Sequence, residues 1–310
     1  MAQKIIIDTD PGIDDAMAIF TALRSPEVEV VGMTTVFGNT PVDVTTMNAL
    51  RLRELEGNEH VPVARGCAVP MVIALEKVAV HVHGEDGMGN INPPPPRSKA
   101  LDIPAPQFIV EMVLANPGEI ILMPVGPLTN IAMALRLEPK IAGLVKGVVL
   151  MGGAAGVPGN ISPVAEANIY HDPHAADIVF GADWQVTMVG LDVTTRVKMT
   201  REYMQKMGDS GSKPTALLKR MWPCYVGFHD QFYGMGGTIH THDPSAITYI
   251  IHPEWFHTEA YPVYVEGAGR CMGQTALDRH HQWPARRPTN VCLDVEVEQE
   301  LNFLMERLTK

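Results

Sequence analysis

The sequence predicts an α/β fold, in which a doubly wound, mostly parallel sheet carries helices on both of its faces. Short apolar runs alternate with amphipathic stretches along most of the chain, which is the order that parallel strand-helix-strand units produce. Several of these runs are apolar throughout, as strands of a sheet covered on both faces require. We expect the chain to form one domain over residues 1–310.

The first predicted elements illustrate the local patterns. Residues 5–7 are a β-branched run closed by Asp8, which indicates a buried strand. Residues 14–24 place Ala16, Ile19 and Leu23 on one helical face. The alternation then continues with strands at 28–35, 61–64, 120–124, 147–150 and 186–189, and with helices at 43–55, 107–114, 128–135 and 173–180.

The pattern changes after residue 200. Residues 200–255 are mainly helical and rich in Met, Trp and Tyr. They are followed by predicted strands at 260–266 and 291–297 and by a helix at 299–308. Four prolines at 93–96 predict a stiff loop, because no shift in composition follows them.

Charge and composition exclude several classes of function. The chain has 24 Lys and Arg against 35 Asp and Glu, for a net charge of −11, which argues against binding to nucleic acids or anionic membranes. No run reaches the ~18–20 apolar residues of a membrane helix. The four scattered cysteines fit a reducing compartment. We therefore expect a soluble, cytoplasmic protein.

Polar residues follow the predicted strands, where the carboxyl ends of parallel strands form ligand sites. Asp8, Asp10, Asp14 and Asp15 place four carboxylates in eight positions. Helix capping needs only one or two of them, and four would repel one another without a cation or raised pKa values. Oxygen ligands favour a hard cation, either Mg²⁺ or Ca²⁺.

Other polar groups have an ordinary alternative explanation. His242 and Asp243 form a ligand or acid-base pair, or else Asp243 caps a helix that begins at Pro244. Asn160, Glu166 and Asn168 suggest recognition of hydroxyl groups, or else a solvated loop. His81 and His83 precede a glycine-rich segment that also fits a plain surface turn.

Ordered blocks of sequence resemble the inosine-uridine-preferring nucleoside hydrolases over nearly the whole chain. The blocks begin with the Asp-rich motif at 5–16 and continue at 37–39, 83–87, 124–130, 151–153, 165–169, 190–194 and 242–244. The resemblance implies a Rossmann-like sheet and hydrolysis of the N-glycosidic bond of purine or pyrimidine ribonucleosides, uridine and inosine above all, in nucleoside salvage or catabolism. The segment from His81 to the prolines at 93–96 resembles the plant-type uridine nucleosidase branch more than other branches.

The resemblance also implies a Ca²⁺ site and a mechanism. Asp10, Asp15, Asp243 and the main-chain carbonyl of Val125 would hold the ion, with Asp8 as a further ligand or close neighbour. Asp10 would be the general base for a water on the ion. The family implies a homodimer or homotetramer.

Substrate contacts follow by position in the same way. His242 would protonate or hydrogen-bond the leaving base, or share this role with His240 or His229. Tyr225 and His229 lie four residues apart on one helical face and contact the base or merely pack. The remaining implied contacts are Asp14, Asn39 and Asn168 with the secondary hydroxyls, Asn160 and Glu166 with the 5′ side, Met151 with the substrate, and His83 in a mobile loop over the base.

Three other functions remain as alternatives. A phosphohydrolase of the haloacid-dehalogenase type also opens with two aspartates after its first strand, but here Gly12 stands where that family has Thr. A nucleoside-binding module would not need Asp10, Asp15 and Asp243. A structural Ca²⁺-binding protein would leave the asparagines unexplained.

Overall fold

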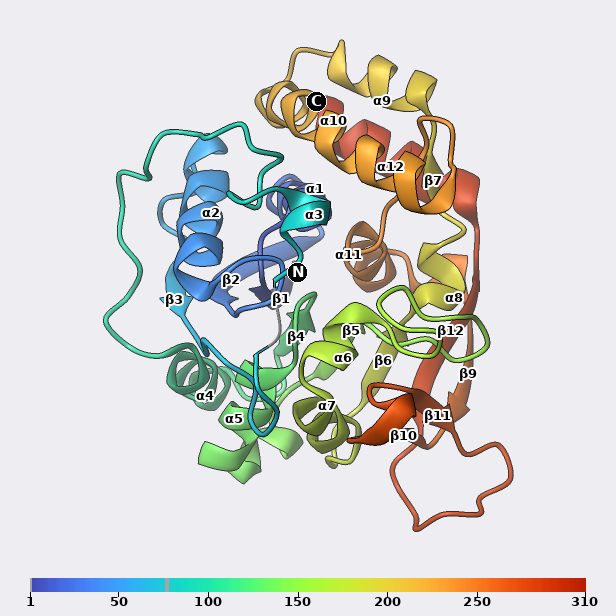
Figure 1. The fold of residues 1–310 in the computed structure, drawn as a ribbon. Helices are drawn as coiled ribbons and strands as arrows, with labels where there is room; N and C mark the ends of the chain where they lie inside the picture. Colours follow the sequence, from blue (N-terminus) through green and yellow to red (C-terminus); the bar gives the residue numbers. More distant parts are fainter. Residues whose placement is uncertain (1, 76–77) are drawn as a thin grey trace.

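The computed structural model describes residues 2–75 and 78–310, and its centre is an eight-stranded sheet (Figure 1). The strand order is β3-β2-β1-β4-β5-β6-β12-β9, and all neighbours are parallel except β12 and β9. The strands are β1 (Gln3–Thr9), β2 (Val28–Thr35), β3 (Val63–Arg65), β4 (Ile120–Pro124), β5 (Gly147–Met151), β6 (Val186–Val189), β9 (Phe256–Tyr261) and β12 (Thr289–Val295). This confirms the predicted α/β class.

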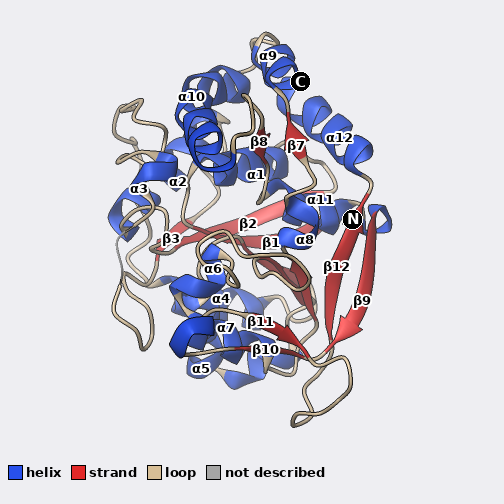
Figure 2. Cartoon of the chain, turned by 45° about the vertical axis from the view of Figure 1, so that its right-hand side comes forward, coloured by secondary structure: helices blue, strands red, loops and turns tan. Residues whose placement is uncertain are grey.

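Side chains of β1 alternate between two separate cores. Ile5 and Ile7 pack into one cluster and Ile6 into the other, as the two-residue period of a strand requires. The first core lies under α1 (Ile13–Leu23), α2 (Val42–Leu55), α9 (Arg201–Gly208), α10 (Lys213–Tyr233), α11 (Pro244–Ile251) and α12 (Val297–Thr309). The second lies under α4 (Ala105–Ala115), α5 (Thr129–Leu137) and α7 (Pro173–Phe180), and Figure 2 shows the two layers on opposite faces.

Several predicted boundaries agree with the structure. The strands at Val28–Thr35, Ile120–Pro124 and Val186–Val189 and the helix at Pro173–Phe180 have the predicted limits. The region after residue 200 is largely helical as expected, although a short antiparallel pair, β7 (Lys198–Met199) and β8 (Ile239–His240), frames it.

The predicted strand over 260–266 was wrong. The chain is in the main sheet only to Tyr261, and β10 (Val263–Val265) then pairs with β11 (Thr275–Leu277) in a separate hairpin. Pro262 stands at the break, where its missing N–H removes one ladder hydrogen bond. The apolar pattern runs through the proline because both short strands are partly buried.

Short elements complete the chain between the main ones. They are α3 (Val80–His83), α6 (Ala167–His171), α8 (Leu191–Thr194) and the 3₁₀ turns Pro139–Gly143, Pro253–Trp255 and Gly269–Cys271.

Among the described residues, no helix has both the length and the apolar composition needed to cross a bilayer.

Candidate active site

Asp10 follows β1 at the carboxyl edge of the sheet and is almost fully buried. Its Oδ2 accepts the backbone N–H of Asn39 at 2.7 Å, whereas its Oδ1 has no hydrogen-bond partner. Gly38 and Gly126 approach this carboxylate closely, and a Cβ on them would lie 2.0 Å from Oδ2 and 2.6 Å from Oδ1 respectively. The loops after β2 and β4 therefore need glycine to enclose Asp10.

Asp14 and Asp15 lie in the first turn of α1, as predicted. Asp15 Oδ1 accepts the hydroxyl of Thr9 at 2.5 Å, and its Oδ2 accepts the N–H of Gly12 at 2.9 Å and the Asn39 amide at 3.1 Å. Asp15 thus caps the helix, but Asp14 points elsewhere: its Oδ2 accepts the hydroxyl of the buried Tyr225 at 3.2 Å. Capping accounts for only part of this motif.

Asp243 joins these two residues from a distant part of the sequence. Carboxylate oxygens of Asp14, Asp15 and Asp243 all lie within 4.8 Å of one another, and all three residues are buried. Asp243 precedes α11 with Pro244 at the first helical position, yet its side chain makes no capping hydrogen bond. The Asp243 carboxylate therefore faces the other acidic groups and does not cap the helix, in contrast with the simple capping interpretation.

The electrostatics of this acidic group favour a bound cation. Burial and the charges of neighbouring carboxylates raise the pKa of Asp10 and of Asp243 well above the usual range, and burial raises the pKa of Asp14 to about 6. Within the described residues, no lysine or arginine pairs with these carboxylates. The free Oδ1 of Asp10 and the all-oxygen donor set fit a hard divalent cation.

Asp8 lies in β1 and stands apart from the group of three. Its Oδ1 accepts the hydroxyl of Thr34 at 2.6 Å and the amide of Asn130 at 2.7 Å, and its Oδ2 has no hydrogen-bond partner. Burial raises the pKa of Asp8 to about 7. These contacts make Asp8 a buried neighbour that links β1, β2 and the start of α5.

A pocket opens directly above the carboxylates. It encloses about 790 Å³ of empty space, its opening to solvent included. Three of the predicted aspartates, Asp8, Asp10 and Asp15, are buried outside its lining. The other predicted site residues all line it: Asp14, Asn39, His83, Val125, Met151, Asn160, Glu166, Asn168, Tyr225, His229, His242 and Asp243.

One wall of the pocket is built around α6. Glu166 caps this helix by accepting the N–H groups of Asn168 at 2.8 Å and Ile169 at 3.2 Å, and it also accepts the N–H of Gly153 at 3.0 Å. The Asn168 amide donates to the main-chain carbonyls of Val125 and of Met151, each at 3.1 Å. This wall therefore ties the loops after β4 and β5 together.

The loop at 154–158 is fixed by Asp192. The two oxygens of Asp192 accept the N–H groups of Ala155 at 2.8 Å and Gly156 at 2.7 Å. Asp192 is thus a loop anchor beside the pocket and is not one of its lining residues.

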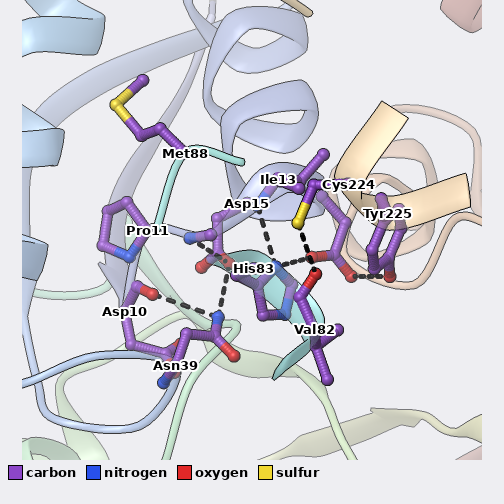
Figure 3. A network of polar contacts seen from close by, with 12 residues as sticks. Asp10, Pro11, Ile13, Asp15, Asn39, Val82, His83, Met88, Cys224 and Tyr225 are labelled. Atoms are coloured by element: carbon purple, nitrogen blue, oxygen red, sulfur yellow. Dashed lines mark hydrogen bonds and ion pairs between the residues drawn. The ribbon is translucent and has the colours of Figure 1, made fainter. Parts of the chain in front are cut away.

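A second wall carries His83, which Figure 3 shows between α1 and α10. Its Nδ1 accepts the N–H of Ile13 at 3.1 Å, and its ring stacks on Tyr225 with 5.4 Å between centroids. Burial lowers the pKa of His83 to about 4. The glycine-rich loop after it, expected to be mobile, is held by Asp86, whose carboxylate accepts the N–H groups of Met88, Asn90 and Asn92.

A row of histidines extends from this wall to His242. Ring centroids lie 4.4 Å apart for Tyr225 and His229, 5.4 Å for His229 and His240, and 5.5 Å for His240 and His242. The Nδ1 of His242 lies 2.8 Å from the hydroxyl of Thr194, and burial lowers the pKa of His242 well below its usual value. His229 lines the pocket, whereas His240 lies behind it.

Several residues that hold or line the site were assigned no role by the sequence patterns. Hydrogen bonds from distant parts of the sequence orient two predicted residues: Thr34 and Asn130 bind Asp8, and Thr194 contacts His242. The partners lie 26 to 122 positions apart in the sequence. His171 and Phe228 line the pocket itself. Asn130 and Thr194 lie inside two of the recognised sequence blocks, which was the available signal, whereas nothing local distinguished the other three.

Comparison with known proteins gives a consistent result. The family model described as inosine-uridine preferring nucleoside hydrolase matches residues 5–302. A probable uridine nucleosidase of Oryza sativa is 43% identical, over 99% of this chain and 96% of its own. The inosine-uridine preferring nucleoside hydrolase of Leishmania major is 42% identical, over 100% of this chain and 98% of its own.

Solved structures agree with the sequence relatives. A plant nucleoside hydrolase superposes with a TM-score of 0.96 at 38% identity, covering 100% of this chain and 99% of its own. A purine-preferring ribonucleoside hydrolase from Gardnerella vaginalis reaches 0.94 at 33% identity, covering 99% and 98%.

Fold and pocket together define a doubly wound α/β protein with a buried acidic centre that suits a cation. The chain belongs to the inosine-uridine preferring nucleoside hydrolase family, whose members are N-glycosidases that act on ribonucleosides. This confirms the resemblance and removes the phosphohydrolase alternative.

Proposed function

We propose that this enzyme hydrolyses uridine, and inosine as a second substrate, to ribose and free base in nucleoside salvage or catabolism. The observation that carries the proposal is the buried group of Asp14, Asp15 and Asp243, of which Asp14 and Asp243 line a pocket with histidines on its wall. The uridine nucleosidases of rice and Arabidopsis thaliana, 43% and 39% identical over 99% of this chain, support the choice of base.

We propose Ca²⁺ as the ion, held by Asp10, Asp15, Asp243 and the carbonyl of Val125, with Asp8 beside it. Ca²⁺ suits this donor set because it takes six to eight oxygen ligands in flexible geometry, whereas Mg²⁺ needs a near-ideal octahedron. When bound, the ion supplies positive charge that favours deprotonation of a water and offsets the carboxylates.

The chain's own residues then perform the reaction as follows. Asp10, through its unpartnered Oδ1, accepts the proton of the water that attacks C1′ of the ribose. Positive charge develops on the ribosyl group as the bond to the base breaks, and the buried carboxylates stabilise it. Asp14, Asn39 and Asn168 orient the ribose hydroxyls, which fixes the direction of attack.

His242 assists departure of the base. Nδ1 of His242 lies 2.8 Å from the Thr194 hydroxyl, and we take that hydroxyl as the donor, which puts the ring proton on Nε2. Because burial lowers its pKa well below the usual value, the ring is neutral at pH 7 and donates a hydrogen bond from Nε2 to the leaving base. His229, whose Nδ1 donates to the Tyr225 carbonyl at 2.8 Å, extends this wall beside the base.

The experiment is an assay of ribose and base release from uridine, inosine, adenosine, xanthosine, cytidine and 2′-deoxyuridine. Each substrate is incubated with Ca²⁺, after chelation, and after Ca²⁺ is restored. We expect uridine to be hydrolysed fastest, 2′-deoxyuridine hardly at all, and chelation to stop the reaction reversibly. Equal rates with and without chelation would contradict the metal site, and a preference for another base would contradict the uridine proposal.

We further propose that the enzyme works in the cytoplasm as a homodimer or homotetramer. Its four cysteines are free, which suits a reducing compartment. Light scattering of the purified protein tests the assembly.

A further inference from the structure

We propose that His171 recognises the 5′-hydroxymethyl group of the ribose and is a specificity-determining residue of this enzyme. The inference rests on the proposed function, because it assigns a part of the same pocket. None of the implied substrate contacts includes this residue.

His171 is the last residue of α6 and is 8% exposed. It lines the pocket one helical turn after Asn168, on the wall that Glu166 also forms. Its Nδ1 is buried and has no hydrogen-bond partner. Because buried polar atoms are nearly always paired, an unpaired one in the lining of a substrate pocket points to a partner on the ligand.

The shape of the pocket indicates which part of the ligand this is. The floor carries the carboxylates, which suit the diol edge of a ribose, and the α10 side carries Tyr225, Phe228 and His229, which suit a flat base. With the diol and the base so directed, C5′ and its hydroxyl are the remaining polar arm of the nucleoside. They face the third wall, which is the wall that holds His171.

The chemistry of the side chain suits a neutral hydroxyl. Burial lowers the pKa of His171 to about 4, so the ring is uncharged at pH 7 and offers one donor and one acceptor. Glu166 stands on the same wall, and its carboxylate disfavours a phosphate there. We therefore assign the site to nucleosides with a free 5′-hydroxyl.

The test compares uridine with 5′-deoxyuridine, which lacks only that hydroxyl, in the wild type and in His171→Phe. We expect His171→Phe to lower kcat/KM for uridine roughly 5- to 10-fold, the effect of one lost hydrogen bond, and to leave 5′-deoxyuridine within about 2-fold. His171→Gln, which keeps a donor and an acceptor, is expected to restore part of the preference. His174→Phe is the matched control, because its Nδ1 is also unpartnered but lies outside the pocket.

Equal losses on both substrates would overturn the proposal, because His171 would then only pack. Hydrolysis of uridine 5′-monophosphate that depends on His171 would overturn it as well, in favour of a phosphate site. If the wild type hydrolyses neither nucleoside, the proposed function fails. Calorimetric binding of uridine and 5′-deoxyuridine to the same variants then tests His171 by itself, and equal affinities would refute its role.

Discussion

Asp10 has surroundings that suit a proton acceptor far better than a structural aspartate. One oxygen is held by the Asn39 N–H, the other is free, and two glycines leave room for the carboxylate. Asp8, two residues earlier, has the opposite character, because Thr34 and Asn130 both bind one of its oxygens. The same residue type in one short motif thus serves different purposes, which only the three-dimensional contacts distinguish.

The change Asp10→Asn is expected to lower kcat for uridine by about 10²- to 10⁴-fold, the usual contribution of a general base. It keeps the size of the side chain and removes a charge from a repelling group, so the melting temperature without metal is not expected to fall. Steady-state kinetics and thermal melts check both. The control Asp183→Asn, at a side chain 92% exposed, should change neither, and wild-type turnover in Asp10→Asn would refute the proposed base.

The change His242→Ala tests assistance to the leaving base. Uridine needs its base stabilised as it departs, whereas a 4-nitrophenyl riboside carries a leaving group that needs no proton. We expect turnover of uridine to fall by about 10²-fold or more and that of the riboside to change far less. His60→Ala, on the exposed surface, is the control. Similar losses on both substrates would show that His242 only shapes the pocket.

At the scale of elements, the carboxyl ends of the parallel strands gather the site. The loops after β1, β2, β4 and β5 contribute Asp10, Gly38, Gly126 and Gly153, while α1 and α11 contribute the carboxylates. The glycines after β2 and β4 are needed because the backbone passes within contact distance of Asp10. The geometry of these loops is therefore part of the candidate metal site.

Gly126→Ala tests this relation, because its new Cβ would lie 2.6 Å from Oδ1 of Asp10. We expect the affinity for Ca²⁺, measured by calorimetry, to fall by about tenfold or more, equivalent to ~1.4 kcal/mol. The matched control is Gly143→Ala, where a Cβ meets nothing within 4 Å. Unchanged affinity in Gly126→Ala would mean that Asp10 can move without loss, and hence that it is not a ligand.

Local patterns predicted the central strands well because each is a short apolar run ended by a polar loop. They failed at 260–266, where a continuous apolar pattern hid the break at Pro262 between two sheets. Ordered sequence blocks predicted the residues that line the pocket. Thr34, Thr194 and His171 were missed because their roles depend on partners or on a cavity that no local pattern encodes.

At the scale of the whole molecule, the enzyme buries carboxyl groups and histidines whose charged forms are disfavoured by their surroundings. Burial raises the pKa values of Asp8 and Glu300 to about 7, and those of Asp10 and Asp243 further. Burial also lowers the pKa values of pocket histidines such as His83 to about 4. The two sets oppose each other near and below pH 6.5, where a histidine of the unfolded chain is still half protonated. Above about pH 7 the carboxylates dominate the pH dependence of stability.

The stability of the metal-free protein is therefore expected to fall from about pH 7 to pH 8. A carboxyl group with a raised pKa binds more protons in the native state than in the unfolded one, so ν_U − ν_N is negative and the free energy of unfolding decreases as pH rises. Each such group contributes at most about 1.4 kcal/mol per pH unit. Thermal melts in chelator check this pH dependence of stability, and Asp10→Asn should make it less steep.

Ca²⁺ should raise the melting temperature more at pH 8 than at pH 6.5, because protons compete with it for the same oxygens. A metal-free protein that gains stability over this range would contradict the raised pKa values, and an equal effect of Ca²⁺ at both pH values would mean that the ion binds somewhere other than these carboxylates.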